Sequence, residues 1–359
     1  MFNKLKSIKT YIKPSLFMSQ EQSTKVKQPK WFNPVTDEKS DSLKLLNTLT
    51  REKNVFQPIS NNKSVSWYSC GPTVYDTSHM GHARNYVSID INRRILEDYF
   101  GYDINFVQNV TDIDDKIILR ARQTYLFDKY CKENSEKIDF NFIDLKIKPQ
   151  LIKFINDNLK LNIVTVEDYI TWKNNVDIEA LKVENPKAPM YINSINSSIE
   201  GLDNINTLDI NVFYNNIKDV LIAYLDNNFG KEVNDPEVFI ELPRYWENEF
   251  NKDMQRLNVK SPSITTRVSE YVPEIVSYVE KIIENGFAYP TKDGSVYFDT
   301  ARFDQSEAHD YAKCQPWNKG KLDLIEDGEG SLTSSEALDN KKSPNDFALW
   351  KSSKPGEPK

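Results

Sequence analysis

Two of the three histidines in the chain, His79 and His82, flank Gly81, and a cysteine, Cys70, shortly precedes them. Imidazole N–H groups can hydrogen-bond a polyphosphate and stabilise the charge that develops when a phosphorus atom is attacked. A glycine between them lets a ligand approach the backbone closely. A helix that begins here would add free amide groups and the positive end of its dipole. The pattern therefore predicts a phosphate-binding site at a helix N-terminus.

Each of these residues also has a plainer interpretation. A His-x-x-His pair is often a pair of zinc ligands or a chance arrangement on a surface, and a single cysteine such as Cys70 is often a small buried hydrophobe. The run 111–116 on its own is typical of a capped, solvated helix start. The segment lacks G-x-G-x-x-G and the P-loop pattern, so dinucleotide and Walker-type sites are not supported.

The elements that must position these residues form a βαβ unit. Residues 64–70 have strand character, residues 83–100 repeat apolar side chains at helical spacing before Gly101, and residues 103–108 form a second strand-like run. A unit of this kind has parallel strands and a right-handed crossover. It places residues 70–82 at the carboxyl end of the first strand, where open α/β sheets bind their ligands.

The rest of the chain is mixed in character. We expect a helix after Thr111, and residues 131–240, rich in asparagine, carry helical patterns that we interpret as an inserted helical module. A further helix is predicted over 273–285. Residues 287–299 predict a hairpin that turns at Asp-Gly, and residues 318–345 an exposed loop.

Composition limits the class of protein. The 359 residues are 39% hydrophobic, enough for a core, and no apolar run approaches the ~18–20 residues of a membrane span, so no membrane partner is expected. Three cysteines make no disulfide framework, which favours the cytoplasm. Residues 1–18 resemble a mitochondrial presequence, which makes them a candidate targeting segment for a mitochondrial form. A frayed basic tail is the alternative, and Met18 could be the start.

Three segments, taken together, resemble the cysteinyl-tRNA synthetases, which are class I aminoacyl-tRNA synthetases. They are C-G-P-T-V-Y-D from Cys70, H-M-G-H-A-R from His79 and N-V-T-D-I-D-D-K-I-I from Asn109. The second contains the HIGH signature of the class, and residues 116–119 match the KIIK element of the family with its last lysine replaced. The resemblance resumes over residues 244–300 and again near the end of the chain.

The resemblance implies an α/β fold, the first half of a Rossmann-like nucleotide-binding domain with a helical insertion and a connective α+β region. Residues 1–63 would be an N-terminal extension and residues 64–130 the first half of the catalytic domain. Residues 131–240 would be the insertion, and residues 241–359 a connective region that stops before the second catalytic half.

The resemblance also implies a reaction. Members of the family join L-cysteine to ATP, acting with Mg²⁺, to give cysteinyl-adenylate, and then transfer the cysteinyl group to tRNA(Cys). His79 and His82 correspond to the residues that hold ATP and stabilise the transition state, with Gly81 also at the ATP site. Gly71 and Thr111 correspond to positions that contact the cysteine.

Two further roles follow from the resemblance. Cys70 corresponds to one ligand of an active-site zinc that binds the substrate thiol as a thiolate, in keeping with the preference of zinc for sulfur. Lys116 corresponds to an ATP-site residue, and a solvated helix lysine is the alternative.

The remaining family motifs lie beyond the region that matches Pro358. They include three more zinc ligands, the KMSKS loop and the anticodon-binding helices. We therefore expect residues 1–359 alone to be an inactive, poorly folded fragment. Two other functions stay open: a related ligase that couples cysteine to a small amine, which the insertion disfavours, and a shortened, non-catalytic paralogue with a binding or regulatory role.

Overall fold

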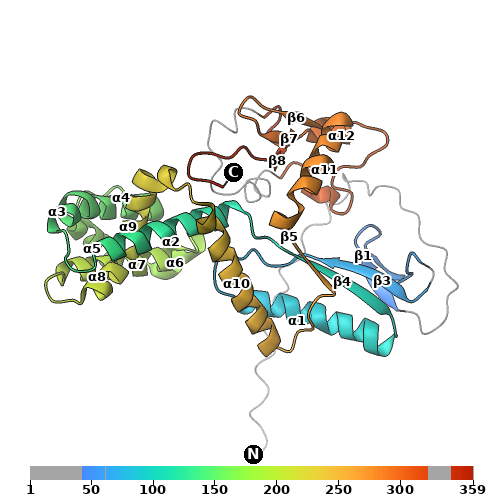
Figure 1. Cartoon of the computed structure of the whole chain (residues 1–359), viewed down its shortest axis with the longest axis horizontal. Helices are drawn as coiled ribbons and strands as arrows, with labels where there is room; N and C mark the ends of the chain where they lie inside the picture. The colour runs from blue at the N-terminus through green and yellow to red at the C-terminus, as the bar shows by residue number, and fades with distance from the viewer. Residues whose placement is uncertain (1–42, 61, 322–340, 359) are drawn as a thin grey trace, which may run out of the picture.

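The computed structural model, which describes residues 43–60, 62–321 and 341–358, contains a three-stranded parallel sheet, drawn at the lower right of Figure 1. Its order is β3 (Ser64–Ser69), β4 (Asp103–Val110) and β5 (Ile264–Arg267). The first two strands confirm the predicted βαβ unit. The third was not predicted, because its four residues, I-T-T-R, form no apolar run of diagnostic length.

Helix α1 (Met80–Arg94) connects β3 to β4 and continues through a π-helical turn, η2 (Ile95–Tyr99). The helix predicted over 83–100 is thus present but begins earlier, at Met80. The reason is local, because His79 caps the helix with its own side chain. Gly101 follows in the left-handed region (φ +67°), as a residue after a helix C-terminus often does.

A helical module projects away from the sheet (Figure 1). Helix α2 (Asp115–Glu133) leads into it and α10 (Pro236–Arg256) leads back, and side chains of both helices join its core. Between them lie α3 (Phe140–Phe142), η3 (Ile143–Ile147), α4 (Lys148–Leu159), α5 (Val166–Asn175), α6 (Ile178–Glu184), α7 (Ala188–Asp203), α8 (Ile210–Asn216), α9 (Lys218–Phe229) and η4 (Gly230–Glu232). Apolar side chains one helical turn apart, such as Leu151 and Ile155, are fully buried there.

The last part of the chain is mixed α and β. After η5 (Val268–Tyr271) and α11 (Val272–Glu284) comes an antiparallel sheet of β6, β7 and β8. Its elements and neighbours are β6 (Ala288–Pro290), β7 (Val296–Phe298), α12 (Thr300–Asp304), η6 (Pro316–Asn318) and β8 (Phe347–Trp350). The predicted helix and hairpin are confirmed, with Gly294 of the turn at φ +89°. Most of the loop predicted over 318–345 lies outside the described residues.

The N-terminal region supplies one described element before the sheet. A hairpin of β1 (Lys44–Asn47) and β2 (Glu52–Val55) lies within the segment that we expected to be an extension. The candidate targeting segment, residues 1–18, lies outside the described residues.

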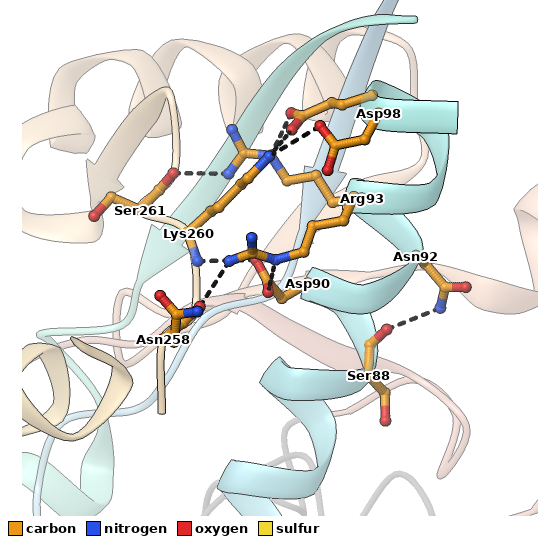
Figure 2. Close-up of polar contacts among 10 residues, drawn as sticks. Ser88, Asp90, Asn92, Arg93, Asp98, Asn258, Lys260 and Ser261 are labelled. Carbon is orange, nitrogen blue, oxygen red and sulfur yellow. Dashed lines mark hydrogen bonds and ion pairs between the residues drawn. The ribbon is translucent and has the colours of Figure 1, made fainter. Parts of the chain in front are cut away.

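Charged side chains join the end of α1 to the loop that leads into β5 (Figure 2). Arg93 pairs with Glu97 at 2.7 Å and donates to the backbone carbonyl of Ser261 at 2.7 Å. The Nζ of Lys260 also pairs with Glu97, at 2.7 Å. Burial acts to raise the pKa of Glu97, but the hydrogen bonds from Lys260 and Arg93 outweigh it and hold that pKa below its usual value.

A second group of contacts reinforces the same junction (Figure 2). The buried carboxylate of Asp90 accepts the backbone N–H of Lys260 at 2.8 Å and pairs with Arg94 at 2.6 Å. Arg94 in turn donates to the carbonyl of Asn258 at 2.7 Å. These contacts fix β5 against α1, the helix whose other end carries the two histidines.

Candidate functional site

The two histidines close the N-terminus of α1 with their own side chains. The Nδ1 of His79 accepts the backbone N–H of Gly81 at 3.0 Å, and the Nδ1 of His82 accepts the backbone N–H of His79 at 3.2 Å. The two rings are stacked, with centroids 4.0 Å apart. This arrangement is a capping box built from two imidazoles, and it satisfies amide groups that the helix itself leaves unpaired.

The hydrogen bonds fix the tautomer of both rings. A backbone N–H can only donate, so each Nδ1 must be the unprotonated acceptor and each Nε2 must carry the proton. Burial, together with the neighbouring His79, lowers the pKa of His82, which favours the neutral ring. The site therefore presents two Nε2–H donors beside the positive end of a helix dipole, an arrangement that suits a phosphate.

Gly81 is required by the packing of His79. A Cβ at position 81 would lie 2.8 Å from Cε1 and 2.9 Å from Nδ1 of the His79 ring. Any side chain here would push that ring out of its capping position. The absence of a side chain at Gly81 therefore allows the His79 ring to cap the helix, and it also leaves room for a ligand.

The residues that follow β3 run alongside the end of β4. Thr73 forms a parallel bridge with Thr111, and the backbone N–H of Thr111 donates to the carbonyl of Pro72 at 3.0 Å. Gly71 packs so closely that a Cβ there would overlap the carbonyl oxygen of Asn109. The exposed Cys70 lies at the same carboxyl edge. The sheet thus brings together Cys70, Gly71 and Thr111, although they are far apart in the sequence.

Asn109 was missed as a site residue by the sequence reasoning. Its Oδ1 accepts the backbone N–H of Gly71 at 2.8 Å and the hydroxyl of Tyr68 at 3.1 Å. Its Nδ2 donates to the hydroxyl oxygen of Thr111 at 3.3 Å. The available signal was its position, because an amide at the carboxyl end of a buried strand lies where neighbouring strand ends converge.

Lys116 lies in the first turn of α2 with an exposed side chain. Its backbone N–H donates to the capping carboxylate of Asp114 at 3.3 Å, and its ammonium lies 5.9 Å from the ring centroid of Tyr75. Tyr75 belongs to the loop between β3 and α1, so the lysine faces the segment that carries the histidines. This position suits an anion bound over that loop and equally suits a solvated lysine.

A cavity of about 510 Å³ opens at the carboxyl ends of β4 and β5, between α2 and α10. Asp112 lines it and accepts the backbone N–H of Ser269 at 3.0 Å and also the Ser269 hydroxyl. Arg267, at the end of β5, holds the buried Glu247 of α10 through hydrogen bonds as short as 2.6 Å. Ser269 is a second residue that the sequence reasoning did not single out.

The described residues do not by themselves form a metal site. No group of three or more His, Cys, Asp or Glu side chains able to hold a metal ion occurs among residues 43–60, 62–321 and 341–358. Structural zinc takes four ligands and catalytic zinc at least three from the protein. Cys70 is therefore at most one ligand, and the residues present do not fit a complete zinc site. The helices in the same ranges are also too short or too polar to cross a membrane.

The fold and the site together define a class of protein: a parallel α/β domain with paired imidazoles at the N-terminus of the helix that follows the first strand of its sheet. Residues 55–359 match the family model described as the tRNA synthetases class I (C) catalytic domain. The chain belongs to this family.

Curated relatives agree with this assignment. The chain is 46% identical to "Cysteine--tRNA ligase, cytoplasmic" of Mus musculus over 334 residues, which is 92% of this chain and 38% of the relative. It is 46% identical to the protein of the same name from Gallus gallus, over 92% of this chain and 42% of the relative. The Homo sapiens protein of the same name is 45% identical, over 92% of this chain and 42% of the relative. The chain thus spans about two fifths of the length of these relatives.

Proposed function

We propose that the protein containing this chain is a cysteine–tRNA ligase, which activates L-cysteine with ATP and Mg²⁺ and transfers it to tRNA(Cys). The observation that carries the proposal is the pair of imidazoles that cap the N-terminus of α1 through their Nδ1 atoms. The names of the relatives, each a cysteine–tRNA ligase, support the choice of amino acid and nucleic acid.

The activation step fits the geometry of the site. A carboxylate oxygen of cysteine forms a bond to the α-phosphorus of ATP, the bond from that phosphorus to its bridging oxygen breaks, and pyrophosphate leaves. Negative charge grows on the oxygens around phosphorus during this exchange. The Nε2–H groups of His79 and His82, with the helix dipole behind them, stabilise that charge. Gly81 leaves room for the phosphates, and Lys116 adds a positive charge.

The amino-acid side of the site is assigned to the strand ends. Gly71 and Thr111, which Asn109 links, lie where the cysteine would be held. Cys70 would supply one ligand of a zinc ion, with the others drawn from outside the described residues. Zinc binds thiolate in preference to hydroxyl oxygen, which would favour cysteine over serine.

The proposed division of the chain follows the same reasoning. Residues 64–130 form the first half of the catalytic domain, residues 131–240 an insertion and residues 241–359 the connective region, after an extension over residues 1–63. We propose a cytoplasmic location, which the names of the relatives support. A mitochondrial form would depend on residues 1–18, and fusing them to a fluorescent protein tests it by where the fusion accumulates.

The test is amino-acid-dependent ATP–pyrophosphate exchange and tRNA charging by the longest form of the protein that contains residues 1–359. Cysteine, and not serine, should support exchange, and tRNA(Cys) should be charged. Exchange with cysteine but transfer only to a small amine would favour the related ligase. A stable protein without exchange activity would favour the non-catalytic paralogue.

A further inference from the structure

Asn109 connects the two positions that we assign to the cysteine substrate. Gly71 follows the end of β3 and Thr111 follows the end of β4. One amide side chain bonds to both, at 2.8 Å from the Gly71 nitrogen and 3.3 Å from the Thr111 hydroxyl oxygen. Its own backbone carbonyl packs against Gly71 too closely to admit a Cβ there.

The direction of these bonds follows from their chemistry. The Gly71 N–H can only donate, so the atom of Asn109 that faces it must be Oδ1. Nδ2 is then turned toward Thr111, and because an amide nitrogen only donates, the Thr111 hydroxyl must accept. The hydroxyl proton of Thr111 is left to point away from Asn109. The Gly71 amide is committed to Asn109 and is not available to a ligand.

We propose that Asn109 is a positioning residue for the amino-acid pocket, which sets the backbone at Gly71 and the direction of the Thr111 hydroxyl. The proposal rests on the proposed function, because it assigns Gly71 and Thr111 to cysteine. Tyr68 contributes to the same arrangement, since its hydroxyl donates to the Oδ1 that holds Gly71 and thereby restrains the amide from rotating.

Two substitutions separate the bonds. Asn109→Ala removes all of them. Asn109→Asp has nearly the same shape and still accepts from Gly71, but it has no donor for Thr111, whose hydroxyl must then turn and donate to the carboxylate. The Thr111 proton would no longer be available to a substrate. Asn105→Ala is the matched control, because Asn105 is an exposed asparagine on the same strand.

The experiment measures cysteine-dependent ATP–pyrophosphate exchange by the longest form of the protein, with KM determined separately for cysteine and ATP. Asn109→Asp should raise KM for cysteine about tenfold, the effect of one lost hydrogen bond, and Asn109→Ala should raise it at least as much. KM for ATP should stay within about twofold of wild type in both variants. The control, Asn105→Ala, should have the wild-type KM for both cysteine and ATP. Thermal unfolding of each variant accompanies the kinetics, and Asn109→Asp remains informative where Asn109→Ala does not fold.

A double-mutant cycle with Thr111→Val tests the route of the effect. If Asn109 acts through Thr111, the double variant Asn109→Asp with Thr111→Val should have a KM for cysteine no higher than that of the more impaired single variant. Three outcomes would each overturn the proposal and leave the proposed function intact. They are an unchanged KM for cysteine in both Asn109 variants, equal increases in KM for cysteine and for ATP, and additive effects of the two substitutions in the cycle. A wild-type protein without cysteine-dependent exchange would overturn both.

Discussion

The backbone N–H of His79 donates to Nδ1 of His82, and the Nδ1 of His79 accepts from Gly81, so each imidazole caps the helix through the same ring atom. The pair therefore does two things at once. The inner nitrogens satisfy the helix N-terminus, and the outer nitrogens are left as protonated donors for a ligand. Capping and ligand binding can be separated by substitution.

Asn in place of His79 should keep the cap and lose the outer donor, since asparagine is among the best N-cap residues. His79→Ala should lose both. We expect pyrophosphate exchange to fall about 100-fold or more in each variant, while only His79→Ala loses about 1 kcal/mol of unfolding free energy. Exchange assays and urea denaturation measure the two effects, with the neighbouring Ser78→Ala as control. A fully active His79→Asn variant would contradict this account.

The lowered pKa of His82 gives a direct spectroscopic prediction. The ring should titrate below about 6.5, its ordinary value, in an NMR titration of its ring protons. Because the folded pKa lies below the unfolded one, the contribution of this group to stability is complete above about pH 6.5 and is lost as pH falls through the folded pKa. Substitution of each histidine assigns the signals. A midpoint above 6.5 would contradict the effect of burial and of the neighbouring His79 on this ring.

Two glycines should respond differently to the same substitution. Gly71→Ala should cost more than about 2 kcal/mol of unfolding free energy, because the added Cβ overlaps the backbone of Asn109, which cannot move aside cheaply. Gly81→Ala meets only the His79 ring, and alanine is the better helix former by about 0.5–1 kcal/mol. We expect Gly81→Ala to fold but to lose exchange activity as the ring is displaced. Similar stability losses in both variants would be inconsistent with the geometry.

The βαβ unit and most of the site could be predicted because the signals were local. The apolar spacing of α1 and the glycine after it each report on a few neighbouring residues. The residues that correspond to the family motifs also form continuous segments. For these reasons Cys70, Gly71 and the two histidines could be placed at one sheet edge from sequence alone.

The contacts between distant segments could not be predicted. Asn109 bonds to Gly71, and Ser269 to Asp112, across parallel strands whose register no single segment encodes. Strand β5 is too short to give a pattern of its own, and it pairs with β4 from far along the chain. The apolar spacing predicted a helix only from residue 83, whereas His79 caps a helix that begins at Met80, through a side-chain bond that no residue spacing reveals.

The charged junction between α1 and β5 predicts a dependence of stability on acid. The pKa of Glu97 is lowered, so its contribution to stability is complete above its unfolded value of about 4.5 and is lost as pH falls through the folded value. Glu97→Gln should cost about 1–3 kcal/mol near pH 7, because Arg93 and Lys260 lose their charged partner.

Urea denaturation at a series of pH values checks this prediction. The difference between wild type and Glu97→Gln should shrink below about pH 4.5, as the wild-type carboxylate takes up its proton. Glu241→Gln, at an exposed position on α10, is the matched control. A difference that stays constant from neutral pH to acid would show that Glu97 contributes through packing and not through its charge.

The most direct test of the central claim is cysteine-dependent ATP–pyrophosphate exchange by the longest form of the protein that contains this chain, measured for wild type and for His82→Ala. Exchange should require cysteine, should not occur with serine, and should fall about 100-fold or more in the variant. Exchange that proceeds without cysteine, or that His82→Ala leaves unchanged, would contradict the assignment of the paired imidazoles to cysteine activation.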